Sequence, residues 1–318
     1  TVTGVETSMT AKIIVNAAGP WAEGCLENVV ERAKVTPMRL VKGSHIVVPK
    51  MFDHDSAYIF QNPDRRIVFA IPYENDFTMI GTTDEDFDGD LAHISASEAE
   101  IEYLCETSNR FFGKQISKDD IVWKFAGVRP LLGGGAGSAK EVTRDYRLDV
   151  QDLGNNSVLL SVLGGKITTY RKLAEQAVDR LVQECGRDAD AWTAQAPLPG
   201  GDIPSGDIAA FISEMQEKYS WLPADVVARY VRLYGSDTDA LINPAESLDD
   251  MGEYFGAGLY EHEVQYLVDR EWARNAEDIL WRRTKLGVVG GVEVAEKLCR
   301  WFDAGAADEA GSRTLANG

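Results

Sequence analysis

Two strand-to-helix junctions constrain the fold of this 318-residue chain more than any other feature of its sequence. Residues 12–15 form a short apolar run of the kind buried in parallel sheets, and the small residues 16–19 follow it directly. Residues 158–163 run in the same way into the glycines 164–165 and then into a helical pattern over 171–185. These junctions predict an α/β fold in which unpaired N–H groups at two helix N-termini favour an anionic cofactor.

Each junction is also compatible with an ordinary tight turn between a strand and a helix. Lys166, directly after the glycine pair, favours the ligand-binding interpretation, because a cation beside a helix N-terminus is unfavourable unless an anion lies nearby. The glycine-rich run 133–137 is different, since it lacks the P-loop pattern and a strand rather than a helix is expected after it. We expect a surface loop there.

Between the two junctions the sequence changes to short β-type runs with brief connections. Parallel neighbours need a crossover of about a dozen residues, so these connections predict antiparallel pairing. Two overlapping capping boxes, Ser95 with Glu98 and Ser97 with Glu100, open a helix expected to end near residue 112. Strands are predicted at residues 44–48, 57–60, 66–73, 77–82, 121–132, 145–150 and 158–163.

The last third of the sequence predicts helices only. Residues 186–206 contain the prolines and glycines typical of a linker. Beyond this linker, helical patterns cover residues 207–219, 223–234, 260–275, 276–286 and 291–303. The predicted fold class is therefore α/β plus all-α.

Basic residues within the predicted strands are conspicuous because the chain holds 51 Asp and Glu against 32 Lys and Arg, a net charge of −19. Strand alternation places Gly127 and Arg129 on one face, with Gly127 leaving room where a side chain would stand. Arg144 opens the next strand. The two arginines together with Lys166 would make a phosphate clamp, since Arg suits bidentate recognition of phosphate. For either arginine alone, a salt bridge to an acid is the alternative.

His45 is the histidine best placed for chemistry, because it leads into the apolar run 46–48. It is either a satisfied core residue or a general base, since an imidazole pKa near 7 suits proton transfer. The acidic run 84–90 resembles a calcium-binding loop in composition but lacks the EF-hand spacing. We expect it to be a solvated loop.

The net charge and the cysteines exclude several classes of function. A charge of −19 argues against sequence-independent nucleic-acid binding and against simple electrostatic adhesion to anionic lipid. No apolar run approaches the roughly 18 residues that span a bilayer. The four cysteines lie far apart with no metal-ligand spacing, so we expect reduced, buried thiols and no metal site.

Seven motifs stand in order along the chain: Asn16-Ala17-Ala18-Gly19-Pro20-Trp21-Ala22, Lys42-Gly43-Ser44-His45-Ile46-Val47-Val48-Pro49, Ile80-Gly81-Thr82-Thr83-Asp84, Gly127-Val128-Arg129-Pro130, Thr143-Arg144-Asp145-Tyr146, Gly164-Gly165-Lys166-Ile167-Thr168-Thr169-Tyr170-Arg171 and Leu198-Pro199-Gly200-Gly201. This ordered set closely resembles the flavin-dependent, aerobic, quinone-linked glycerol-3-phosphate dehydrogenases within the D-amino-acid-oxidase-like group. The resemblance covers residues 11 to about 303.

The resemblance implies a split architecture. Residues 1–35 and 158–185 would form part of an FAD-binding α/β domain, interrupted by a substrate domain with a large, mostly antiparallel sheet over 36–157. The linker 186–206 would lead to a helical C-terminal domain over 207–318.

The resemblance also implies the chemistry. FAD would take a hydride from C2 of sn-glycerol 3-phosphate, giving dihydroxyacetone phosphate, and electrons would pass to a quinone. Arg129 and Arg144 would bind the substrate phosphate, and His45 is the candidate acceptor of the hydroxyl proton. Two groups would lie against FAD: Ala17, Ala18, Gly19 and Trp21 on the adenosine–diphosphate side, and Gly164, Gly165, Lys166 and Thr168 at the flavin C2=O/N1 edge.

The family's amino-terminal glycine fingerprint for the FAD diphosphate is not in this sequence, so the chain is expected to be an inactive carboxy-terminal piece that binds FAD weakly or not at all. The alternatives are a glycerol-3-phosphate oxidase that uses oxygen, and a non-catalytic helical module for interaction or membrane docking. The expected location is the cytoplasm, with attachment to the inner face of the cell membrane and a homodimer left open.

Overall fold

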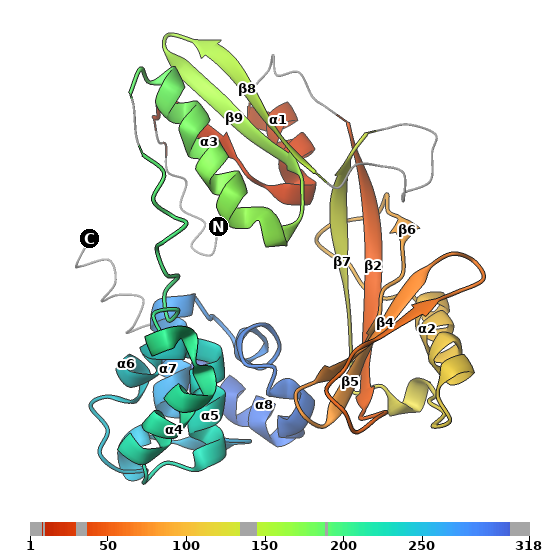
Figure 1. Cartoon of the computed structure of the whole chain (residues 1–318), viewed down its shortest axis with the longest axis vertical. Helices are drawn as coiled ribbons and strands as arrows, with labels where there is room; N and C mark the ends of the chain where they lie inside the picture. Colours follow the sequence, from red (N-terminus) through yellow and green to blue (C-terminus); the bar gives the residue numbers. More distant parts are fainter. Residues whose placement is uncertain (1–7, 9, 30–36, 134–144, 188–189, 306–318) are drawn as a thin grey trace. The chain divides into compact units, whose positions relative to one another are not determined.

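The structure is a computed structural model that describes residues 8, 10–29, 37–133, 145–187 and 190–305, without the side chains of 27–29. The chain divides into two compact units, Thr1–Ala194 and Gln195–Gly318 (Figure 1). The first unit contains two sheets and the second consists mainly of helices, so the predicted class of α/β plus all-α is confirmed.

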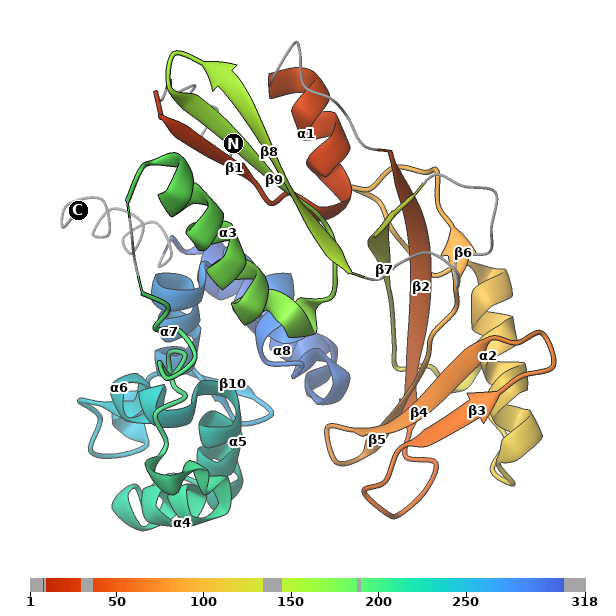
Figure 2. The same ribbon diagram turned by 45° about the horizontal axis from the view of Figure 1, so that its top comes forward.

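The smaller sheet of the first unit holds both strand-to-helix junctions. Its strand order is β1 (Ile13–Asn16), β9 (Ser157–Gly164) and β8 (Tyr146–Gly154), with β1 parallel to β9 and β8 antiparallel to β9. A 3₁₀ turn over Gly19–Trp21 leads from β1 into α1 (Ala22–Val29), and one over Ile167–Thr169 leads from β9 into α3 (Tyr170–Glu184). The sheet lies between α1 and α3 (Figure 2).

The larger sheet is antiparallel, as the short connections predict. Its strands follow the order β3-β4-β5-β2-β6, and β7 also pairs with β2. The long strand β2 is therefore central, since β5, β6 and β7 all pair with it. The strand bounds are Met38–Pro49 for β2, Tyr58–Gln61 for β3, Ile67–Tyr73 for β4, Phe77–Gly81 for β5, Glu85–Asp86 for β6 and Trp123–Leu132 for β7.

Helix α2 (Glu98–Phe111) covers one face of this sheet. The helix begins with the predicted capping box, in which the Ser97 side chain and the Glu100 side chain each accept a hydrogen bond from the other residue's backbone N–H. Its apolar side packs on alternate residues of the strands, which gives this core cluster: Ile46, Val48, Met51, Phe60, Val68, Ala70, Ile80, Ala96, Ile101, Leu104, Cys105 and Ile116. A 3₁₀ turn over Lys118–Asp120 then leads towards β7.

The second unit has one continuous core, but the expectation of helices alone is wrong at one point. Two short strands, β10 (Tyr254–Gly256) and β11 (Leu259–Tyr260), form an antiparallel hairpin. The helices are α4 (Ile208–Lys218), α5 (Ala224–Tyr234), α6 (Thr238–Ile242), α7 (Glu261–Glu271), a π-helix (Asp278–Arg283) and α8 (Gly287–Asp303), with 3₁₀ turns over Pro204–Gly206, Gly235–Asp237 and Asp249–Met251. The helical periodicity of apolar residues, on which the prediction rests, does not reveal strands of two or three residues.

Three further expectations differ from the structure. Strand β8 pairs with β9 in the smaller sheet, so the sheets change before residue 146 rather than at 158. The helical spacing of Trp21, Cys25 and Leu26 predicts one buried helix face, but Trp21 is 53% exposed. All four cysteines are free, but Cys185 and Cys299 are exposed rather than buried.

Arg144 and most of the glycine-rich run 133–137 lie outside the described residues. Within the described part of the chain, no helix is both long enough and apolar enough to cross a bilayer.

The Pro-Gly-Gly segment of the linker packs directly against the end of α5. Ser236 N donates to Gly200 O at 3.0 Å, and Gly235, the C-cap of α5, has a φ of +56°. A Cβ on Gly235 would lie 1.8 Å from Gly200 O, and a Cβ on Gly200 would lie 2.2 Å from Tyr234 O. Both positions therefore need glycine.

Gly235→Ala is accordingly expected to lower the free energy of unfolding of the helical unit by about 2 kcal/mol or more, through the clash and the positive φ. Urea or thermal unfolding measures this. Gly113→Ala is the matched control, because its Cβ would meet nothing within 4 Å and its φ is not positive. Equal effects of the two substitutions would contradict the close packing described here.

Candidate active site

His45 and Arg129 lie on the same face of the larger sheet, opposite to the face that α2 covers. The register of β2 with β7 sets His45 opposite Phe125 and Val41 opposite Arg129. Side chains two residues apart on a strand share a face, so positions 41, 43 and 45 face the same way as 129, 127 and 125. The α2 side is formed instead by the alternate residues, such as Ile46 and Val48.

Glycines beside each of these two side chains make the space for them. A Cβ on Gly43 would lie 2.3 Å from Arg129 Nη2, and a Cβ on Gly81 would lie 2.2 Å from His45 Cδ2. A Cβ on Gly127 would meet nothing within 4 Å. The space over Gly127, on the face that carries both His45 and Arg129, is therefore open, as the alternation predicts.

The guanidinium of Arg129 is held by the turn after β5. Its Nη1 lies 2.9 Å from Asp84 Oδ1, and its Nη2 donates to Thr82 Oγ1 at 3.3 Å and to Thr83 O at 3.4 Å. The Arg129 side chain is nevertheless 38% exposed. The salt bridge that sequence reasoning gave as the alternative thus exists, and it holds the guanidinium at the open space.

The surroundings of His45 favour the neutral form of its imidazole. Its ring stacks on Phe125 with centroids 5.0 Å apart and planes 7° apart, and its buried Nδ1 has no hydrogen-bond partner among the described residues. Burial, and secondarily the positive charge of Arg129, lower the pKa of His45 below its ordinary 6.5. A neutral imidazole beside a guanidinium can accept a proton from a group bound next to a phosphate or carboxylate.

Sequence reasoning missed two partners in this arrangement. The acidic run 84–90 was expected to be solvated, but the Asp84 side chain is only 19% exposed and pairs with Arg129. Thr82 also contacts Arg129. Their position directly after Gly81 was the available signal, but only the tertiary structure brings this turn to β7.

A second group of predicted residues surrounds the smaller sheet. Because β1 and β9 are parallel, with Asn16 opposite Ser161, the two junctions lie at the same edge of the sheet. The Asn16 amide closes the first junction: Nδ2 donates to Ala22 O at 2.9 Å, and Oδ1 accepts from Ala18 N at 3.3 Å. Gly19 begins the following 3₁₀ turn with a φ of +56°.

A cavity of about 310 Å³ lies beside this first junction. It is lined by Ile14, Val15, Asn16, Ala17, Ala18, Cys25, Leu26 and Leu159. Ala17 and Ala18 leave the backbone open to a ligand, and Trp21 presents an exposed ring nearby in sequence. These features fit a partly apolar cofactor.

The second junction also leaves its backbone accessible. Gly164 and Gly165 adopt φ values of +72° and +94°, and a Cβ on Gly164 would lie 3.1 Å from the Leu132 side chain. Lys166 and Thr168 are exposed, and no hydrogen bond or ion pair of the Lys166 ammonium is found among the described residues. Because Leu132 ends β7, the strand that carries Arg129 also contacts the glycine junction.

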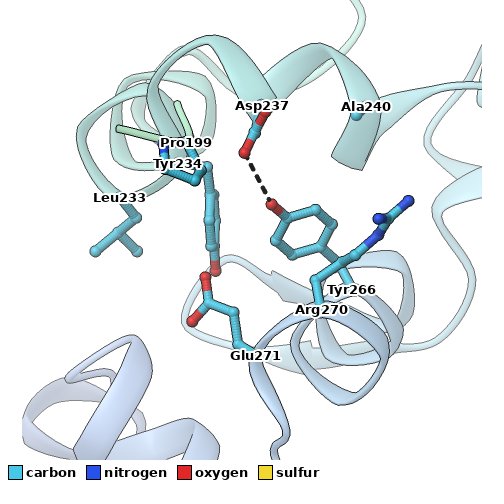
Figure 3. Close-up of a pocket in the computed structure, with 8 residues that line it drawn as sticks. All are labelled: Pro199, Leu233, Tyr234, Asp237, Ala240, Tyr266, Arg270 and Glu271. Carbon is cyan, nitrogen blue, oxygen red and sulfur yellow. Dashed lines mark hydrogen bonds between the residues drawn. The ribbon is translucent and has the colours of Figure 1, made fainter. Parts of the chain in front are cut away.

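The helical unit has a separate cavity of about 430 Å³ (Figure 3). Pro199 of the linker and Tyr234 at the end of α5 form part of its wall, and Tyr266 donates a long hydrogen bond of 3.5 Å to Asp237 across it. Burial raises the pKa of Glu271, which also lines it. None of the predicted site residues borders this cavity. In the described part of the chain, no group of acidic, histidine or cysteine side chains could hold a metal ion.

Two known families match this chain, and the boundary between the two matches falls close to the boundary between its two compact units. Residues 1–171 match the family described as FAD dependent oxidoreductase, and residues 191–306 match the C-terminal domain of alpha-glycerophosphate oxidase.

Several curated proteins are similar over most of this chain. An aerobic glycerol-3-phosphate dehydrogenase of Escherichia coli is 43% identical, covering 94% of this chain and 60% of the relative. A D-erythritol 1-phosphate dehydrogenase of Brucella abortus is 44% identical, covering 95% and 60%. A glycerol-3-phosphate dehydrogenase of Pseudomonas aeruginosa is 45% identical, covering 88% and 55%.

Among solved structures, the glycerol-3-phosphate dehydrogenase of Bacillus halodurans complexed with FAD matches with a TM-score of 0.75 and 30% identity, covering 99% of this chain and 60% of that one. The chain thus spans about 60% of the length of these relatives.

His45 is expected to titrate with a midpoint below 6.5, because burial and Arg129 both disfavour its protonated form. Imidazole proton NMR across pH 4 to 9 measures this midpoint. Arg129→Ala should raise the midpoint, since one of the two causes is then removed. A midpoint at or above 6.5 would contradict the described site.

Proposed function

Because the chain belongs to the FAD-dependent oxidoreductase family that includes the glycerol-3-phosphate dehydrogenases, we propose that it forms part of an enzyme that oxidises sn-glycerol 3-phosphate at C2 to dihydroxyacetone phosphate. The observation that carries this proposal is that His45 and Arg129 lie on one face of the sheet, with the open space over Gly127 between them. A phosphate ester with a neighbouring hydroxyl needs both a guanidinium and a proton acceptor.

Residues of the larger sheet are proposed to bind the substrate and to accept its proton. Arg129 binds the phosphate dianion, with Asp84 and Thr82 fixing the plane of its guanidinium. Arg144 is proposed as a second phosphate ligand. His45 accepts the proton of the C2 hydroxyl as the C2–H bond breaks. Burial, and secondarily the charge of Arg129, lower the pKa of His45 and so favour its neutral form before the reaction.

The junctions of the smaller sheet fit the cofactor side. FAD, when bound, supplies the acceptor for the hydride. Ala17, Ala18, Gly19 and Trp21 are proposed to contact its adenosine–diphosphate side. Gly164, Gly165, Lys166 and Thr168 are proposed to lie at the C2=O/N1 edge of its ring, where the Lys166 ammonium and the start of a helical turn stabilise negative charge.

Two phosphate esters of the same chemical class are candidate substrates. The relative that acts on D-erythritol 1-phosphate, by its name, is as similar in sequence as those named for glycerol 3-phosphate. Both compounds combine a phosphate with a secondary alcohol. Comparing kcat/KM for the two esters in the flavin-loaded enzyme distinguishes these functions.

A quinone is the proposed electron acceptor, which would bring the enzyme to a membrane surface. Direct reaction with oxygen and a purely docking role of the helical unit are the competing functions. Reoxidation of the reduced enzyme by a quinone analogue and by air separates the first two. Membrane association after deletion of residues 198–318 tests the third.

Arg129→Ala in the flavin-loaded enzyme is expected to lower kcat/KM for the phosphate ester at least 10-fold, about 1.4 kcal/mol, because the phosphate loses a charge-assisted contact. Steady-state kinetics measure this effect. Arg110→Ala is the control, since Arg110 lies on α2, on the other face of the sheet. Kinetics unchanged by Arg129→Ala would remove Arg129 from the substrate site.

The 318-residue chain alone is proposed to supply only part of the flavin site, because its relatives extend over a length of which it covers about 60%. We expect the purified chain to carry far less than one equivalent of flavin, measured by absorbance at about 450 nm, the region of the flavin band. Stoichiometric flavin that survives gel filtration would contradict this proposal.

A further inference from the structure

One carboxylate, that of Glu100, lies beneath both segments that form the candidate site. Glu100 stands in the first turn of α2 and is 1% exposed. Its Oε1 accepts hydrogen bonds from Ser44 Oγ at 2.8 Å and from Thr83 Oγ1 at 2.7 Å. Ser44 belongs to β2 and Thr83 to the turn after β5, so a single oxygen joins two separate stretches of chain.

The second oxygen anchors this contact to the helix and balances its charge. Glu100 Oε2 accepts from Ser97 N and from Ser97 Oγ, both at 2.8 Å, and lies 2.8 Å from Lys42 Nζ. Burial alone would raise the pKa of Glu100, but the donors of Lys42, Ser97, Thr83 and Ser44 outweigh it and lower the pKa to about 2. The group is therefore a carboxylate at every physiological pH.

The residues that Glu100 holds alternate along the chain with the residues of the site. Ser44 points down to Glu100, whereas its neighbour His45 faces the open side of the sheet. Thr83 likewise contacts Glu100, whereas Thr82 and Asp84 on either side of it contact Arg129. Ser44 N also donates to Thr83 Oγ1 at 2.9 Å, which ties the two segments together.

We propose that Glu100 is a positioning residue for the candidate active site, holding β2 and the Thr82–Asp84 turn in the one arrangement in which His45 and Arg129 flank the space over Gly127. This inference rests on the proposed function for its kinetic consequence. A capping box requires only the reciprocal contacts of Ser97 and Glu100. The hydroxyls of Ser44 and Thr83 are additional, and both come from chain that bears the site.

The helix-capping role and the positioning role of Glu100 can be separated by substitution. Glu100→Gln disturbs both roles, whereas Thr83→Val removes only a hydroxyl on the site side and keeps the volume of the side chain. Ser97→Ala removes the cap but leaves the contacts with Ser44 and Thr83. Glu106→Gln, an exposed acid on the same helix, is the matched control.

In the flavin-loaded enzyme, Thr83→Val and Glu100→Gln are expected to raise KM for the phosphate ester at least 10-fold, with a smaller effect on kcat. The reason is that the Thr82–Asp84 turn no longer holds the guanidinium of Arg129 in position. Ser97→Ala should lower the melting temperature yet leave KM and kcat within twofold, and Glu106→Gln should change neither. An equal kinetic loss in Ser97→Ala, or an unchanged KM in Thr83→Val, would overturn the proposal.

A measurement on the 318-residue chain separates this proposal from the proposed function. The NMR titration midpoint of His45 should rise towards 6.5 in Thr83→Val and in Glu100→Gln, as the site loosens and water reaches the ring, and stay unchanged in Ser97→Ala. If that shift occurs in a protein inactive on polyol phosphates, the proposed function fails and the positioning role stands. If the wild type is active and the His45 midpoint does not move, the positioning role fails.

Discussion

The alternation of side chains between the two faces of strand β2 is the main constraint on the larger sheet. β5, β6 and β7 all pair with this strand, so its alternation sets the chemistry of both faces of the larger sheet. One face carries Ile46 and Val48 into the core under α2. The other face carries His45 and an open space over Gly127. A shift of register by one residue would exchange the two faces and destroy both.

In a chain with a net charge of −19, the basic side chains that lie in or beside the protein interior form ion pairs with acidic partners. Arg129 is paired with Asp84 on the open face, Lys42 with Glu100 beneath it, and Arg229 with Glu263 at 2.6 Å in the core of the helical unit. Removing one member of a buried pair is costly, because the remaining charge stays desolvated. Arg129 differs from the other two cations, since its side chain is more exposed and its pair borders open space.

The smaller sheet depends on a different constraint, the parallel pairing of β1 with β9. Parallel strands bring their carboxyl ends to one edge, so small residues far apart in sequence, Ala17 with Ala18 and Gly164 with Gly165, come to the same side of the sheet. The contact of Leu132 with Gly164 then links this edge to the strand of Arg129. The substrate side and the cofactor side of the site proposed here thus belong to one unit of the chain.

Local patterns in the sequence predict most of the secondary-structure elements, and they single out most of the residues proposed for the site. Local patterns were enough for the α/β junctions, the antiparallel strands, the capping box of Ser97 with Glu100, and the shared face of Gly127 and Arg129, because each depends on residues near one another in the chain. No local pattern predicts that Asp84 forms an ion pair with Arg129, that Trp21 is exposed, or that β8 joins the smaller sheet. These features depend on tertiary contacts, as do the hydrogen bonds by which Glu100 joins Ser44 to Thr83, because strand pairing brings together residues that no local pattern relates.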